Sequence, residues 1–207
     1  MYENFIKESD RFSEDNSKDV DTLDLHYNYS NVSLLFEECG NSTFRNGVYR
    51  IHNVKSSNDW GITIGNYFPP YLGKIAPFGY DWLGRQFCTL KGNENLILLF
   101  DPSTCEDFKL EQNLIDFHNN DLIFDRESTL SEKLFKEILE LLKTTRISYN
   151  DCIGYKTPPF LGGRDLIENY ELINLEVYWE FQCQLYNQIK DLPHGTKINS
   201  IKFEKPK

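Results

Sequence analysis

The sequence lacks the segments that direct a protein into a membrane or out of the cell. Its first residues contain no basic stretch followed by an apolar one, so we expect no signal peptide. The longest apolar runs, such as Leu96 to Phe100, are far shorter than the roughly 20 residues that cross a bilayer. We therefore expect a cytoplasmic protein that does not associate with membranes.

Positive charge is scarce. The 207 residues contain 22 Lys and Arg against 32 Asp and Glu, which gives a net charge of −10. A nucleic acid would be repelled, since no cluster of basic residues offsets this charge. Apolar residues make up 40% of the chain and aromatic residues 14%, too much for a disordered acidic protein. The composition predicts a folded acidic protein with one domain or two small ones.

Cysteine and histidine are few and are not spaced as metal ligands. The five cysteines form no C-x-x-C pair, so we expect reduced and buried thiols, namely Cys39, Cys88, Cys105, Cys152 and Cys183. The four histidines, His26, His52, His118 and His194, form no zinc-binding pattern. We expect neither a metal nor another cofactor.

Motifs of catalysis and phosphate binding are also missing. The chain contains no G-x-S-x-G, no G-x-x-x-x-G-K-[ST] and no G-x-G-x-x-G. His118 follows Asp116 closely and could act as a base, but a polar residue at a helix end explains this pattern as well. We therefore predict a protein that is not an enzyme, and a hydrolase using His118 remains an alternative.

Several segments have the pattern of amphipathic helices. Asn31 can cap a helix that ends before Gly40, and a short helix is expected near 113–118. Thr129 and Glu132 have the spacing of a capping box before a helix with one apolar face. Another helix is expected after Asn174, because apolar residues there recur at intervals of three and four.

Other segments are predicted to be strands. Residues 47–51 alternate apolar and polar residues, and residues 78–87 are predicted to form a turn that enters a strand. An interior strand is predicted at 95–100, another strand at 152–156 and an edge strand at 198–203. Residues 58–68 fit a helix or a strand, and Pro69-Pro70 predicts an extended connection. Strands and helices occur in groups, so we predict an α+β fold: a mixed or antiparallel sheet flanked by helices, with two lobes sharing one compact core.

The chain divides into three parts. Residues 1–24 are predicted to form an acidic, mobile arm, in which Phe5, Ile6 and Phe12 could make one docked helical turn. Residues 25–92 form an N-terminal lobe and residues 93–207 a C-terminal lobe, because the one change in composition lies near Lys91-Gly92-Asn93.

Two surface features are candidate binding sites. Between Asp101 and Glu140 the chain carries 11 acidic and four basic residues, which indicates either a solvated helical face or a surface for a basic partner. The candidate partner-binding residues are Asp116, Asp121, Asp125, Glu127, Glu132, Glu137 and Glu140. A glycine turn with two nearby cations could bind an anion or be an ordinary tight turn; its residues are Lys156, Gly162, Gly163 and Arg164.

The C-terminal half resembles the C-terminal domain of the immunity proteins paired with type VI secretion DNase toxins. The matching stretches are residues 78–87, 98–102, 117–119, 152–163 and 175–179. The N-terminal half, at residues 34–36, 47–51, Trp60 and Phe68-Pro69, looks like the GAD-like domain of that family. A similar helix-then-strand opening occurs in the SUKH immunity superfamily, which is the distant alternative.

The resemblance implies an antitoxin that is not an enzyme. Such a protein would bind a cognate toxin, expected to be basic and of the DNase type, and occlude its active or substrate-binding surface in the cytoplasm of the producing cell. A small-ligand or anion-binding regulatory module without a toxin partner is the alternative.

We expect the aromatic residues of the shared stretches, Trp82, Phe160, Tyr178 and Trp179, to lie in the core. We also expect Asp81 and Arg85 to form a pair that holds a turn. The identity of the toxin, the face that binds it and the oligomeric state are left open.

Overall fold

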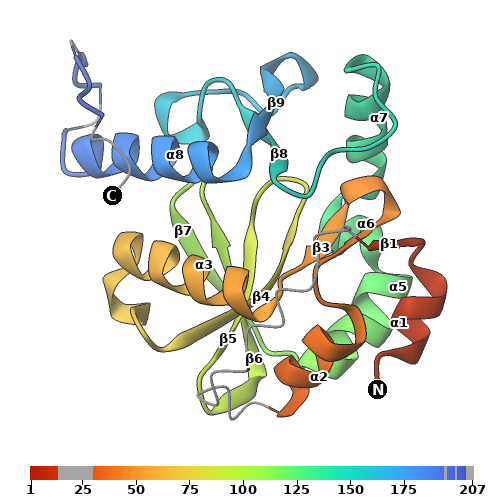
Figure 1. Cartoon of the computed structure of the whole chain (residues 1–207). Coiled ribbons are helices and arrows are strands. Elements are labelled where there is room, and N and C mark those ends of the chain that lie inside the picture. Colours follow the sequence, from red (N-terminus) through yellow and green to blue (C-terminus); the bar gives the residue numbers. More distant parts are fainter. Residues whose placement is uncertain (14–29, 194, 199, 204–207) are drawn as a thin grey trace.

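One antiparallel sheet, in which the strands pair in the order of the sequence, lies at the centre of the molecule (Figure 1). The computed structural model describes residues 1–13, 30–193, 195–198 and 200–203. The strands of the large sheet are β1 (Arg11–Ser13), β2 (Ser42–Phe44), β3 (Tyr49–Ile51), β4 (Ile75–Asp81), β5 (Gln86–Leu90), β6 (Asn93–Asp101) and β7 (Glu106–Leu110). A second sheet pairs β8 (Asp151–Tyr155) with β9 (Tyr170–Asn174), also antiparallel.

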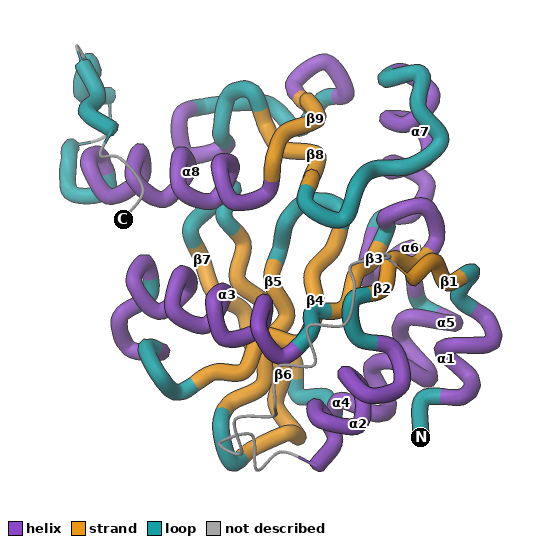
Figure 2. Tube along the Cα trace, viewed as in Figure 1, coloured by secondary structure: helices purple, strands orange, loops and turns teal. Residues whose placement is uncertain are grey.

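Helices cover both faces of the large sheet (Figure 2). They are α1 (Glu3–Glu8), α2 (Ser30–Cys39), α3 (Val54–Tyr67), α4 (Leu114–Asp116), α5 (Leu122–Phe124), α6 (Arg126–Leu130), α7 (Glu132–Leu141) and α8 (Leu175–Ile189). The buried side chains of α3 and α8 share one hydrophobic cluster, and those of α1, α2 and α4–α7 share another. The predicted α+β class is confirmed. No helix in the described ranges is long and apolar enough to span a membrane.

The two clusters explain the continuous apolar run in β6. Successive residues of a strand point to opposite faces, and Ile97 and Leu98 accordingly belong to different clusters. Both side chains are fully buried, and β6 pairs with β5 on one side and β7 on the other. The interior strand predicted at 95–100 is confirmed.

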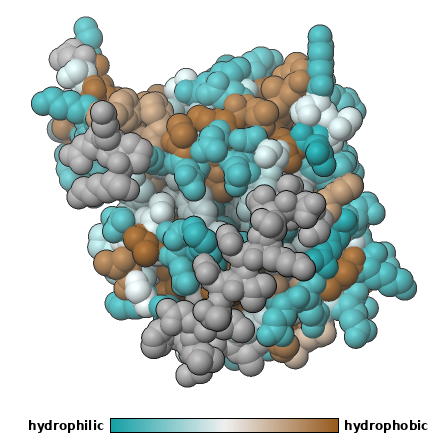
Figure 3. All heavy atoms as spheres, in the orientation of Figure 1, coloured by the Kyte–Doolittle hydropathy of each residue, from teal (hydrophilic) through white to brown (hydrophobic). Residues whose placement is uncertain are grey.

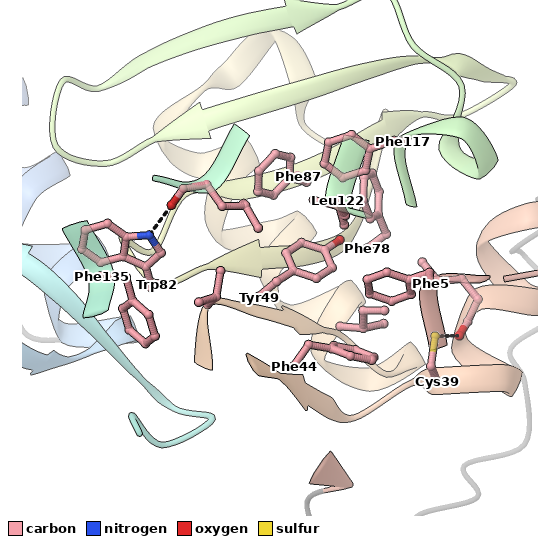
Figure 4. Close-up of a cluster of buried hydrophobic side chains, with 14 of the residues drawn as sticks. Phe5, Cys39, Phe44, Tyr49, Phe78, Trp82, Phe87, Phe117, Leu122 and Phe135 are labelled. Carbon is pink, nitrogen blue, oxygen red and sulfur yellow. Dashed lines mark hydrogen bonds between the residues drawn. The ribbon is translucent and has the colours of Figure 1, made fainter. Parts of the chain in front are cut away.

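Aromatic side chains fill much of the core between the sheet and the helices α1, α2 and α4–α7 (Figure 4). Trp82 is fully buried, packs against Phe135 at 5.5 Å between ring centroids, and donates its indole N–H to Leu130 O at 2.5 Å. Tyr178 and Trp179 are also buried, in the cluster on the opposite face. These three residues belong to the core as predicted, whereas Phe160 is only half-buried.

The turn after β4 joins the two sheets. Asp81 accepts hydrogen bonds from the N–H groups of Leu83 and Arg85, both at 3.0 Å, and pairs with the Arg85 guanidinium at 2.6 Å. Ile153 N in β8 donates to Trp82 O at 2.7 Å, and Trp179 Nε1 in α8 donates to Gly84 O at 2.7 Å. The predicted Asp81–Arg85 pair is confirmed, and it holds the loop on which the small sheet and α8 rest.

The first residues of the chain pack against the core. Helix α1 buries Phe5, whose ring lies 4.6 Å from that of Phe44 and 5.0 Å from that of His118. Strand β1 then pairs with β2. The docked turn that the sequence allowed is therefore present within residues 1–13, while residues 14–24 of the predicted arm lie outside the described residues.

The predicted boundary between the two lobes falls in the hairpin that connects β5 and β6. Both strands belong to the same sheet and are paired along their length, from Gln86 with Phe100 to Leu90 with Asn93. The division into residues 25–92 and 93–207 therefore remains a proposal.

Three local predictions between residues 47 and 132 are wrong, each for a physical reason. Pro69-Pro70 starts a short 3₁₀ helix, η2 (Pro69–Tyr71), because the fixed φ of proline also suits a first helical turn. The capping box between Thr129 and Glu132 does not form: Ser131 has a φ of 51° and separates α6 from α7. The strand predicted at 47–51 spans only Tyr49–Ile51 and is buried on both faces rather than half-buried.

The C-terminal segment lies against α8 instead of adding an edge strand. Residues 198 and 200–203 have no strand structure, and the backbone of Lys202 exchanges hydrogen bonds with the Gln188 side chain at 2.7 and 3.0 Å. Phe203 stacks on Phe181, with ring centroids 4.9 Å apart. Figure 3 shows hydrophobic residues gathered over α8, where this segment covers part of the exposed helix.

Candidate partner-binding surface

The chain between β7 and α7 forms a broken helical segment. The Asn113 side chain caps α4 by accepting a hydrogen bond from Asp116 N at 2.8 Å. The chain then passes through a π-helical turn, η3 (Phe117–Asp121), into α5 and α6. The short helix predicted near 113–118 is therefore the start of a longer segment. Because π turns are rare and are frequent at functional sites, this segment is a candidate for function.

His118 lies on the buried side of this segment. It is fully buried, its Nδ1 lies 2.8 Å from Leu114 O, and its Nε2 lies 3.2 Å from the Tyr49 hydroxyl. Burial lowers the pKa of His118 to about 4, although the bond to Leu114 acts in the opposite direction. His118 is therefore a neutral core residue that no solvent-borne substrate reaches, and this contradicts the hydrolase alternative.

Two buried histidines are expected to make folding stability depend on pH. Burial lowers the pKa of both His52 and His118 to about 4, below the 6.5 of the unfolded chain. The unfolded state then binds more protons between these values, so stability is lost as the pH falls through this window. We expect a loss of about 2 kcal/mol per histidine between about pH 7.5 and about pH 5. Urea unfolding at both pH values, with NMR titration of the imidazoles, measures it; imidazole pKa values near 6.5 would contradict this account.

Three predicted acidic residues lie together on the exposed side of the segment. Burial, and then the charges of Asp125 and Asp116, raise the pKa of Asp121, although its hydrogen bond from Gln112 lowers it. Asp121 and Asp125 are one helical turn apart, since Asp125 N donates to Asp121 O at 3.0 Å. Asp116, Asp121 and Asp125 therefore form one negative cluster.

An exposed phenylalanine lies next to this cluster in the chain. Phe124 in α5 is 78% exposed, the largest exposed fraction among the large hydrophobic residues of the described chain. It follows Asp121 by three positions, a spacing that makes the two side chains neighbours on the helix surface, and it directly precedes Asp125 in the chain. Sequence reasoning missed Phe124, although Leu122-Ile123-Phe124 offered a signal: three consecutive apolar residues of a helix cannot all face one core. We call Asp116, Asp121, Phe124 and Asp125 the acidic–aromatic face.

Glu132 has a different environment from the other predicted acids. It is 7% exposed, and its carboxylate lies 2.8 Å from Lys136 Nζ, 2.9 Å from Arg126 Nε and 3.5 Å from Arg45 Nη1. Burial alone raises the pKa of Glu132, but the bonds from Lys136 and Arg126 and the charge of Arg45 together lower it. Glu132 is therefore neutralised inside the protein and does not belong to the acidic–aromatic face.

The remaining predicted acids are exposed but mixed with cations. Glu127 accepts a hydrogen bond from Lys133 N at 3.0 Å, so it caps the start of α7. Glu137 and Glu140 lie on the exposed side of α7, a helix that also carries Lys133 and Lys136. The role of these three acids in partner binding remains a prediction, and α7 presents both signs of charge.

In the glycine turn that could bind an anion, the N–H groups already donate hydrogen bonds to carbonyl oxygens of the protein. Gly162 N donates to Pro159 O at 2.9 Å and Gly163 N to Pro158 O at 3.0 Å, while Lys156 Nζ donates to Glu168 O at 2.7 Å. Arg164 is exposed. Gly162 has a φ of 84°, and a Cβ on Gly163 would lie 1.8 Å from Thr157 O, so both glycines are required by the turn itself. These bonds count against a backbone cradle for anions and favour a tight turn.

The cysteines are free thiols in the described structure. Four of the five, Cys39, Cys88, Cys152 and Cys183, are buried and Cys105 is half-buried. Burial raises the pKa of the Cys39 thiol to about 12, although the charge of Arg11 acts in the opposite direction. In the ranges that the structure describes, no group of three or more His, Cys, Asp or Glu residues could hold a metal ion.

Comparisons with known proteins show a similar fold and a family that resembles part of the chain. The fold is similar to that of the crystal structure of Atu4351 from Agrobacterium tumefaciens, with a TM-score of 0.61, 13% sequence identity and 89% of each chain covered. No curated protein sequence matches the chain. Residues 107–186 match the family model described as T6SS immunity protein Tdi1, C-terminal. This match spans the broken helical segment, α7, the small sheet and most of α8. The predicted resemblance to a T6SS immunity protein family is thus confirmed for this part of the chain: residues 107–186 are similar to the C-terminal domain of T6SS immunity protein Tdi1.

Proposed function

We propose that this protein neutralises a secreted toxin by binding it and covering its active or substrate-binding surface. The observation that carries the proposal is the family match at residues 107–186, which indicates a T6SS immunity protein. The acidic–aromatic face lies within the matched residues and is the surface that we propose for toxin docking.

The chemistry of this face favours a basic partner. Three clustered carboxylates, on a protein with a net charge of −10, attract a cationic surface and raise the rate of association. A nuclease needs such a cationic surface to bind its polyanionic substrate. We therefore propose a toxin of the nuclease type, whose substrate-binding surface the acids would occupy.

Phe124 supplies the apolar part of the proposed interface. Exposed aromatic residues surrounded by polar groups are typical of binding hot spots, because they fill a pocket on the partner and exclude water from the polar contacts around them. An aromatic ring that is 78% exposed has little role in the core of this chain. We therefore propose that Phe124 is the anchor and that the acids around it fix its orientation.

We further propose that the protein acts by binding and not by catalysis, in the cytoplasm of the producing cell. His118, the one residue that the sequence offered as a base, is buried and hydrogen-bonded to Leu114 O. Asp116 and Asp125 are exposed and Asp121 is half-buried, so these acids can contact a partner directly.

Co-expression tests the proposal. Proteins encoded by the genes next to this one are the candidate toxins, and each is expressed in cells with and without this protein. We expect one of them to kill cells alone, to be tolerated when this protein is present, and to co-purify with it. An unrelated toxin is the control and should kill in both cases. Failure to protect against every toxic neighbour would contradict the proposal.

A further inference from the structure

A cavity of about 420 Å³ is lined by residues that do not belong to the acidic–aromatic face. Its walls come from the residues around β1, from the turn η1 (Arg45–Gly47) and from α7. Three cations line it, namely Arg11, Arg45 and Lys136, and three apolar side chains, Phe12, Phe135 and Leu139. This protein of net charge −10 thus has a cavity lined by cations.

The cations in this cavity are not balanced by the acids. Glu132 is the buried acid of the cavity, and its carboxylate is shared by Arg45, Lys136 and Arg126. Asp10 is the second acid of the lining and is exposed. The lining therefore has three positive and two negative charges, an excess that one additional negative charge would neutralise.

Arg45 has hydrogen-bonding capacity left over. Its Nη2 donates to Glu8 O at 2.7 Å, and its Nη1 lies 3.5 Å from Glu132, too far for a short charge-assisted bond. Its Nε is buried and has no hydrogen-bond partner within the described residues. A ligand with acceptor oxygens could use this guanidinium, and a carboxylate matches its planar geometry.

The backbone around the cavity is strained. Asp10, Arg45 and Asn46 line it with φ values of 38°, 48° and 62°, and Ser131 immediately before Glu132 has a φ of 51°. Left-handed conformations are unfavourable for residues other than glycine, and they cluster at ligand sites, where the surrounding structure maintains them. Here they place the backbone of Asp10 beside that of Arg45, whose N donates to Asp10 O at 3.2 Å.

We propose that this cavity binds one carboxylate side chain, Asp or Glu, of the toxin, together with an adjacent apolar residue. The carboxylate would bind Lys136, whose side chain is 64% exposed, and Arg45 on the sides that Glu132 does not occupy, and the apolar residue would pack against Phe12, which is 46% exposed. A monoanion fits better than a phosphate group, because the lining has an excess of one positive charge and an apolar wall. The identity of the partner rests on the proposed function, whereas the chemistry of the cavity does not.

Two capped tripeptides test the chemistry directly. One is acetyl-Phe-Glu-Leu-amide, and the other has Gln in place of Glu. Titrated into the ¹⁵N-labelled full chain, the Glu peptide is expected to shift the Arg45 Nε–H signal and to bind about tenfold more tightly than the Gln peptide. Equal binding of the two peptides, or no binding of the Glu peptide up to about 10 mM, would overturn the proposal. Acetate binding as tightly as the Glu peptide would also overturn it, since the cavity would then accept free carboxylates.

A matched pair of lysine variants locates the site. Lys136→Met keeps the apolar stem of a side chain that is 64% exposed, so the fold should tolerate it. It is expected to weaken binding of the Glu peptide about tenfold. Lys133→Met removes the same charge from an exposed position of α7 that does not line the cavity, and it should leave binding unchanged. Equal effects of the two variants would place the peptide elsewhere and contradict the assignment.

The same two variants separate this proposal from the proposed function. Weaker toxin binding by Lys136→Met than by Lys133→Met supports both the carboxylate pocket and the proposed function. A toxin that binds the unaltered protein and both variants equally overturns the carboxylate pocket as a toxin contact, and leaves neutralisation intact. If no neighbouring toxin binds the unaltered protein, the proposed function fails, and the peptide titrations still decide whether the cavity holds a carboxylate.

Discussion

Replacing Phe124 by alanine is expected to weaken toxin binding by about 30-fold or more, the effect of removing an interface hot spot. The free energy of unfolding should change by less than about 0.5 kcal/mol, because a side chain that is 78% exposed makes few contacts within this chain. Titration calorimetry with the toxin identified by co-expression measures the affinity, and urea unfolding measures the stability.

Phe108→Ala is the matched control for this experiment. Phe108 is also an exposed phenylalanine, at 45%, but it lies on the edge strand β7 and not on the acidic–aromatic face. We expect its replacement to leave toxin affinity within about twofold, since most surface residues contribute little to binding. Similar losses in both variants, or no loss in Phe124→Ala, would contradict the assignment of the face.

The acids around Phe124 should affect the rate of association more than the rate of dissociation. Exposed charges steer an oppositely charged partner over a distance, and salt screens this attraction. Replacing both Asp121 and Asp125 by asparagine is therefore expected to slow association about tenfold at low salt and to reduce its salt dependence. Stopped-flow binding at two ionic strengths measures this, and an unchanged rate would show that the toxin docks elsewhere.

Arg50→Met is expected to lower the free energy of unfolding by about 3–5 kcal/mol, as removal of one partner from a buried charged network does. Arg50 is fully buried and donates to three backbone carbonyls: Gly47 O at 2.7 Å, Asp81 O at 3.3 Å and Asp151 O at 2.7 Å. These acceptors lie in η1, β4 and β8, so one guanidinium connects the large sheet to the small one. Methionine leaves all three carbonyls without this donor.

Arg50→Lys and Lys109→Met are the controls for this prediction. Lysine keeps the charge, but one ammonium group cannot reach three separated carbonyls, so it should recover less than half of the lost stability. Lys109 is an exposed cation on β7, and its replacement should change stability by less than about 0.5 kcal/mol. Urea unfolding measures all three variants, and equal stability of Arg50→Met and the unaltered protein would contradict the connecting role of Arg50.

The same arginine shows where sequence patterns are insufficient. The alternation in 47–51 predicted a half-buried strand in which Arg50 would face solvent. Arg50 is instead fully buried, its guanidinium lies over the Tyr80 ring, and carbonyls from distant segments supply its partners. An alternating pattern in the sequence indicates that one face of a strand is buried. It does not indicate which residues far along the chain cover the other face.

Elements with a strong local signal were predictable. Helix α8 begins after Asn174, whose side chain accepts a hydrogen bond from Val177 N at 3.2 Å. Most of its periodic apolar residues face the core as their spacing indicates, whereas Phe181 is 39% exposed. The helix at Glu132 was predicted with the wrong start, because Glu132 binds Lys136 and Arg126 instead of capping the backbone. Side-chain ion pairs can override a backbone capping motif of this kind.

The candidate site was predictable only in part. Charge counting indicated the acidic stretch, and Asp116, Asp121 and Asp125 do lie together. It could not separate these acids from Glu132, which is buried among cations, because both kinds of residue look alike in a sequence. The cavity beside α7 joins residues 10–12, 45–46 and 132–139, a combination that arises only from the tertiary fold.

The most direct test of the account is the stoichiometry of neutralisation. A fixed amount of the toxin is mixed with increasing amounts of this protein, and the remaining toxin activity is measured. Binding and occlusion predict that activity falls linearly and disappears at one molecule per toxin molecule. Loss of toxin activity at ratios far below one would show that each molecule inactivates many toxins, and it would contradict the claim that this protein acts by binding.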